Sequence, residues 1–105
     1  MTRKRFTEHL NNIVEQIRIN YRPQKIILYG SVLKGTDTPH SDVDLLIIKK
    51  TKRRFIERIS DVLLCCDCDV PLEPLVYTPE EIKSRQKLGD FFIKDILKHG
   101  KVLYG

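Results

Sequence analysis

Residues 29–46 read Tyr-Gly-Ser-Val-Leu-Lys-Gly-Thr-Asp-Thr-Pro-His-Ser-Asp-Val-Asp-Leu-Leu, and this stretch decides the fold. It follows a short apolar segment, residues 25–29, and it ends inside a second apolar segment, residues 42–49. Both segments have the length and composition of buried strands. The residues between them are rich in Gly, Thr, Pro and Ser, which predicts a loop with one helical turn at residues 31–34. We therefore expect two strands joined by a polar loop.

Two carboxylates begin the second strand. Asp42 and Asp44 are two positions apart, and alternate residues of a strand point to the same face of a sheet. Two like charges on a mostly buried strand cost stability unless a cation offsets them. Carboxylate oxygens at short separation are the ligands that Mg²⁺ prefers. The pair therefore predicts a divalent metal site.

A Gly-Ser turn ends the first strand. Gly30 lets the backbone come close to a ligand, and the Ser31 hydroxyl with the neighbouring N–H groups suits phosphate oxygens. A Gly-Ser turn and an Asp-x-Asp pair are each common when taken alone. Their combination, with ten residues between Ser31 and Asp42, indicates a site for a phosphate and a metal.

The remaining residues alternate between helical and strand patterns. Apolar spacing predicts helices at residues 6–21, 53–65, 79–88 and 90–99, and strands at residues 70–77 and 102–104. Pro71 and Pro74 favour an edge strand or an irregular ladder. Thr78 with Glu81 predicts a capping box, and Gly100 predicts a left-handed helix end. This alternation predicts an α/β fold, a small mixed sheet flanked by helices.

Length and composition limit the domain organisation. The 105 residues suffice for one domain, residues 1–105, without a separate substrate domain. With 41% hydrophobic and 31% charged residues, the composition excludes a disordered chain. We expect neither a secretory signal nor a membrane anchor, because the longest apolar run, Val62 to Cys66, is short. A cytoplasmic location follows as an expectation.

Cysteines and basic residues each form a cluster. Cys65, Cys66 and Cys68 are too few for a disulfide framework, and the C-x-x-C spacing lacks a second ligand pair for zinc. We interpret them as small buried apolar side chains. The net charge of +5 is concentrated in a basic run at Lys49, Lys50, Lys52, Arg53, Arg54 and Arg58. A solvated turn and helix start is the favoured interpretation of this run, with nucleic-acid binding left open.

The Gly-Ser, ten residues, Asp-x-Asp pattern resembles the signature of the polymerase β-like nucleotidyltransferase superfamily. The resemblance is closest to its minimal nucleotidyltransferase (MNT) branch and covers most of the chain. Lys34-Gly35 looks like that family's basic residue and second glycine, and Ser41 precedes the first acid as it commonly does there. Residues 76–81 are similar to the strand exit and helix start that follow the family's third acid.

The resemblance implies a site of three carboxylates and two Mg²⁺ ions, which transfers a nucleoside monophosphate from a nucleoside triphosphate such as ATP to a hydroxyl. Gly30 and Ser31 would hold phosphates, with Lys34 and Lys49 as candidates to neutralise them. Asp42, Asp44 and a third acid would be the catalytic metal ligands. Glu73, in Leu72-Glu73-Pro74, is the candidate third acid and general base, with Asp69 as the alternative.

The resemblance also implies a partner. Minimal nucleotidyltransferases are often encoded beside a small helical (HEPN) protein, and there they act as antitoxins by complex formation or by adenylylating the toxin. We therefore expect a protein acceptor supplied by another chain. The alternative is a non-catalytic nucleotide- or partner-binding module with a relic active site. The sequence leaves the acceptor, the base of the triphosphate and a homo-oligomeric state open.

Overall fold

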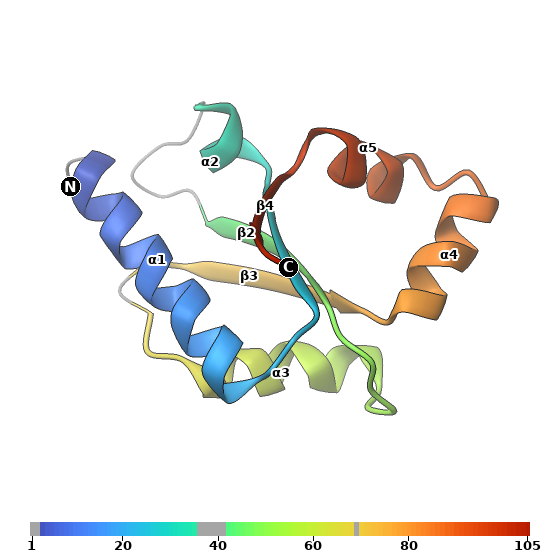
Figure 1. Ribbon diagram of the computed structural model, residues 1–105, viewed down its shortest axis with the longest axis horizontal. Helices are drawn as coiled ribbons and strands as arrows, with labels where there is room; N and C mark the ends of the chain where they lie inside the picture. Colours follow the sequence, from blue (N-terminus) through green and yellow to red (C-terminus); the bar gives the residue numbers. More distant parts are fainter. Residues whose placement is uncertain (1–2, 36–41, 69) are drawn as a thin grey trace.

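The computed structural model describes residues 3–35, 42–68 and 70–105 (Figure 1). In chain order its elements are α1 (Arg3–Asn20), β1 (Lys25–Tyr29), α2 (Ser31–Lys34), β2 (Val43–Ile48), α3 (Phe55–Cys65), β3 (Leu72–Tyr77), α4 (Pro79–Lys87), α5 (Phe91–His99) and β4 (Lys101–Tyr104). Within these residues no helix is long and apolar enough to cross a membrane.

Four strands of the described residues form one mixed sheet in the order β3-β2-β1-β4. β1 pairs antiparallel with β2 and with β4, whereas β3 pairs parallel with β2. The predicted α/β fold with a small mixed sheet is therefore confirmed.

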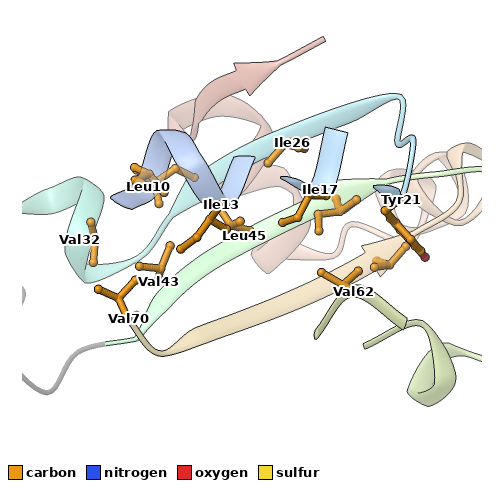
Figure 2. Packing of buried hydrophobic residues seen from close by; sticks show 13 residues of the cluster. Leu10, Ile13, Ile17, Tyr21, Ile26, Val32, Val43, Leu45, Val62 and Val70 are labelled. Atoms are coloured by element: carbon orange, nitrogen blue, oxygen red, sulfur yellow. The ribbon is translucent and has the colours of Figure 1, made fainter. Parts of the chain in front are cut away.

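Helices cover both faces of this sheet. On one face, α1 contributes Leu10, Ile13 and Ile17, and α3 contributes Val62, to a cluster with the inward side chains of the strands (Figure 2). On the other face, Ile82, Ile93 and Ile96 of α4 and α5 pack against Ile27 and Leu46. Each such aliphatic side chain contributes about 1.5–3 kcal/mol when fully buried. The two clusters hold the central strands rigidly between the helices.

β3 is an edge strand, as its prolines predict. The Val43 N–H donates to the Pro71 carbonyl (2.8 Å), and the Lys49 N–H donates to the Tyr77 carbonyl (3.1 Å). Because strand residues alternate in the direction of their backbone groups, Pro74 faces the outer edge rather than β2. An N–H there would have no ladder partner, so Pro74 removes no hydrogen bond from the sheet. The carbonyl of Val76, on the same outward side, accepts from Arg58 Nη1 (3.1 Å).

The predicted capping box of α4 is confirmed. The Glu81 N–H donates to Thr78 Oγ1 (3.1 Å), and the Thr78 N–H donates to Glu81 Oε1 (2.7 Å). The prediction for Gly100 is wrong, because this residue is extended (φ −66°, ψ 156°) rather than left-handed. A Cβ at Gly100 would press on the Ile27 side chain and the Ile96 carbonyl. Gly100 is therefore suited to close packing between α5 and the sheet rather than to a left-handed turn.

The basic run is mostly paired within the fold. Arg53 forms ion pairs with Glu57 and Asp61, both at 2.9 Å. Arg58 is buried, 6% exposed, and it donates to Glu81 (2.6 Å). The interpretation as a solvated segment is therefore wrong for Arg58. Its ion pair with Glu81 links α3 to the first turn of α4.

Candidate active site

The register of the sheet places two of the candidate acids side by side and next to Tyr29. Tyr29 of β1 lies opposite Asp44 of β2, and Asp44 lies opposite Glu73 of β3. The carboxyl groups of Asp44 and Glu73 interact, and this interaction contributes to a raised pKa of Asp44. Parallel pairing of β2 with β3 thus brings together two acids that are far apart in the sequence.

This pair carries unfavourable charge. Burial, the interaction with the Glu73 carboxyl group and the negative charges of Glu73 and Asp42 together raise the pKa of Asp44 to about 6. A hydrogen bond between two carboxyl groups requires a proton on one of them. As the pH rises above this pKa, repulsion between the ionised groups makes the site favour a cation.

Asp42 lies one residue before β2 and is half-buried. The negative charge of Asp42 contributes to the raised pKa of Asp44. Within the described ranges, however, no group of three or more His, Cys, Asp or Glu side chains lies close enough together to hold a metal ion. Asp44 and Glu73 are therefore joined in a pair, and Asp42 stands beside that pair. The donor set consists of carboxylate oxygens, which fit a hard divalent cation such as Mg²⁺ and not a soft metal.

Gly30 packs directly against the pair. Its backbone (φ 84°, ψ −159°) lies in a region that is essentially restricted to glycine. A Cβ at this position would overlap Oδ2 of Asp44. The turn after β1 therefore approaches the carboxylate closely because it has no side chain there.

Ser31 and Lys34 are the first and last residues of α2, which follows this turn. Ser31 is half-buried, and Lys34 is exposed. The backbone N–H of Lys34 donates to the Gly30 carbonyl (3.2 Å), which closes the short helical turn. The expected phosphate-binding residues are thus continuous with the segment that contacts Asp44.

Other sequence predictions fall elsewhere. Lys49 does not lie near Asp44, because it follows the opposite end of β2. Its ammonium group donates to the Tyr21 carbonyl and lies 3.8 Å from the centre of the Tyr21 ring. The prediction that Lys49 neutralises the charge of a triphosphate is therefore wrong. Asp69 and Ser41 lie outside the described residues.

A surface pocket of about 320 Å³ borders Glu73, and sequence reasoning missed it. Its other lining residues are apolar or aromatic: Tyr29, Ile59, Leu63, Leu72, Pro74 and Leu75. The sequence contained one indication of this pocket: Ile59 and Leu63 are four residues apart on α3, so both lie on one face of that helix. The ring of Tyr29 also meets Phe92 of α5 edge-on, with centroids 5.6 Å apart.

Fold and site together define a class of protein. Residues 11–105 match the family described as "Polymerase beta, Nucleotidyltransferase". The chain belongs to this family of nucleotide-transferring enzymes, which act on nucleoside triphosphates and generally use divalent metals.

Individual relatives are consistent with this assignment. A Methanocaldococcus jannaschii protein named "Putative protein adenylyltransferase MJ0604" is 30% identical over 97 residues, which cover 90% of this chain and 94% of that protein. The fold is similar to a crystal structure described as "a putative nucleotidyltransferase from Sulfolobus solfataricus", with a TM-score of 0.59 and 21% identity. That similarity covers 77% of this chain and 73% of the other.

Proposed function

We propose that this protein is a metal-dependent adenylyltransferase that transfers AMP from ATP to a hydroxyl group of a protein. The observation that carries the proposal is the convergence of Asp44, Glu73 and Gly30 at the ends of three different elements. Family membership supports nucleotidyl transfer. The name of the M. jannaschii relative supports adenylyl transfer to protein.

The proposed roles follow from position. Asp44, Glu73 and Asp42 would hold Mg²⁺, since their oxygens fit that cation and their mutual repulsion favours it. Gly30 and Ser31 would bind the β- and γ-phosphates beside Asp44, with Lys34 adding positive charge from the end of α2. The bound cation would lower the pKa of the attacking hydroxyl and offset the charge of the leaving pyrophosphate.

Glu73 is the proposed general base. Its side chain is exposed and borders the apolar pocket, whereas Asp44 lies further inside the sheet. The ionised carboxylate would accept the proton of the acceptor hydroxyl as the oxygen attacks the α-phosphate of ATP. The new P–O bond forms as the bond to pyrophosphate breaks. Positioning and charge stabilisation are the main contributions of the protein.

The test uses ATP labelled at the α-phosphate, Mg²⁺ and, as the candidate acceptor, a purified HEPN-type protein, taken from the neighbouring gene if that gene encodes one. We expect label on the acceptor with wild-type protein, and loss of labelling with the double variant Asp42→Asn, Asp44→Asn and with Glu73→Gln. Glu80→Gln is the matched control, because Glu80 is an exposed acid on α4 outside the site. Equal labelling by the double variant and wild type would refute the proposal.

A HEPN-type partner is the proposed biological context, with this chain as the antitoxin. The exposed apolar side chains of α3, Ile56 at 63% and Leu64 at 86% exposure, are consistent with a protein partner. A HEPN-type partner should inhibit growth when it is expressed alone, and co-expression of this chain should restore growth. Growth inhibition that persists on co-expression would contradict the antitoxin role.

The alternative is a binding module with a relic site. Its support is that the described residues form no preassembled group of three metal ligands. Titration calorimetry distinguishes the two functions, because the proposed enzyme binds ATP in a Mg²⁺-dependent manner and Asp44→Asn weakens that binding. Binding that Asp44→Asn leaves unchanged favours the alternative.

A further inference from the structure

The structure brings two cysteines together that the sequence spacing did not pair. The sulfur atoms of Cys66 and Cys68 lie 3.0 Å apart. The sequence showed a C-x-x-C spacing of Cys65 with Cys68 and predicted no pair, and Cys65 is the last residue of α3. The contact joins two thiols of the segment that leads from α3 into β3. Such closeness is the main geometric requirement for joining two thiols.

Helix α1 holds the backbone of this segment. The side-chain amide of Gln16 donates to the Asp67 carbonyl (3.1 Å), and its oxygen accepts from the Asp67 N–H (2.9 Å). Asn20 donates to the Cys65 carbonyl (2.8 Å). These contacts hold the backbone of Asp67, which lies between the two thiols, and of Cys65, which precedes them. The short sulfur–sulfur distance is therefore set by tertiary contacts and not by the local spacing alone.

The surroundings of Cys66 keep its thiol protonated. Burial, the contact with Cys68 and neighbouring negative charge raise the pKa of the Cys66 thiol to about 12. The thiolate is the attacking form of a cysteine. Cys66 therefore stays protonated at neutral pH, and the exchange proposed below starts at its neighbour in the 3.0 Å contact, Cys68. Both side chains are half-buried, so part of each is open to solvent.

We propose that Cys66 and Cys68 form a redox-active dithiol that exchanges with the disulfide of a low-molecular-weight thiol such as glutathione. The Cys68 thiolate attacks one sulfur of the oxidised reagent, forming a mixed disulfide and releasing one reduced thiol. Cys66 then loses its proton and attacks the Cys68 sulfur, which releases the second reduced thiol. The protein gives up two hydrogens and two electrons, and the reagent's disulfide bond gains them.

This site is separate from the carboxylate pair, and the inference does not depend on the proposed function. The dithiol lies in the connection between α3 and β3, and Cys68 precedes Glu73 by five positions. The mixed-disulfide step needs only the exposed part of Cys68, and the second step needs the 3.0 Å contact.

The test treats the full chain with oxidised glutathione, alkylates the remaining thiols and maps the products by mass spectrometry. We expect wild-type protein to lose two of its three alkylatable thiols and to yield a Cys66–Cys68 linked peptide. Cys65→Ser is the matched control and should form the same linkage to the same extent. Cys66→Ser should stop at a glutathione adduct on Cys68, whereas Cys68→Ser should form no disulfide.

Three alkylated thiols after treatment would overturn the proposal, as would a linkage between Cys65 and Cys68. The same reaction in urea separates the effect of the fold from that of sequence spacing. We expect a smaller yield of the Cys66–Cys68 linkage in urea, because Gln16 and Asn20 no longer hold the segment. An equal yield in urea and in buffer would also overturn the inference.

Discussion

Replacing Gly30 with alanine should destabilise the protein more than an ordinary loop substitution does. Two features act together at this position. The backbone conformation (φ 84°, ψ −159°) is one that only glycine adopts readily, and an L-residue there costs about 1–3 kcal/mol. The new Cβ would also overlap Asp44 Oδ2, and relieving such an overlap costs about 1–3 kcal/mol. Because the two costs add, we expect Gly30→Ala to lower the free energy of unfolding by about 2–6 kcal/mol.

Gly35→Ala is the matched control. Gly35 also has a positive φ (73°), but no atom of the described residues lies within 4 Å of a Cβ built there. Gly35→Ala should therefore cost only the free energy of placing an L-residue in a left-handed conformation, about 1–2 kcal/mol. Urea denaturation of both variants without metal measures the difference between them. Equal destabilisation by Gly30→Ala and Gly35→Ala would refute the close approach of Gly30 to the carboxylate.

A double-mutant cycle isolates the overlap. Asp44→Ala removes the carboxylate and leaves only a Cβ 3.4 Å from the position of the new methyl group. In that background Gly30→Ala should cost about 1–3 kcal/mol less than it does in the wild type. A Gly30→Ala penalty that is unchanged by Asp44→Ala would show that the strain has another origin.

Two further predictions concern the charges of the fold. The raised pKa of Asp44, about 6, means that the metal-free protein binds more protons than the unfolded chain, so its stability should fall as the pH rises from about 4 to 6. Asp44→Asn should remove this loss of stability with rising pH. After allowance for solvent screening, it should stabilise the protein by about 1 kcal/mol at pH 7. Thermal melts in which variant and wild type differ by the same melting temperature at pH 4 and at pH 7 would contradict this. Arg58→Met should cost about 2–3 kcal/mol, because it leaves the buried Val76 carbonyl without the Arg58 donor and breaks the ion pair with Glu81. Arg54→Met, at a side chain 81% exposed, should stay within about 0.5 kcal/mol in the same urea titration, and equal effects of the two would exclude an anchoring role for Arg58.

The local parts of the fold could be predicted from the sequence. β1 and α2 have the predicted bounds, since an apolar run closed by Gly30 leaves few alternatives. The edge position of β3 followed from its prolines, and the cap of α4 followed from Thr78 and Glu81. These features depend on residues that are close together in the chain, where steric rules and short-range hydrogen bonds act.

The parts that depend on long-range packing could not be predicted in the same way. The pairing of Asp44 with Glu73 depends on the parallel register of β2 with β3, which no local pattern specifies. Gly100 lacks a left-handed conformation because packing against Ile27, rather than the helix end, sets its backbone. Arg58 was placed in a solvated run because two of its acceptors, the Val76 carbonyl and the Glu81 carboxylate, come from distant segments. The pairing of Cys66 with Cys68 likewise depends on α1.

The central claim is that Asp42, Asp44 and Glu73 bind the metal while Gly30 and Ser31 bind the triphosphate. A crystal structure with Mg²⁺ and a non-hydrolysable ATP analogue tests it most directly. We expect Mg²⁺ in contact with carboxylate oxygens of all three acids and the β- and γ-phosphates against the Gly30-Ser31 turn. A nucleotide bound elsewhere, or Mg²⁺ held without Glu73, would contradict it.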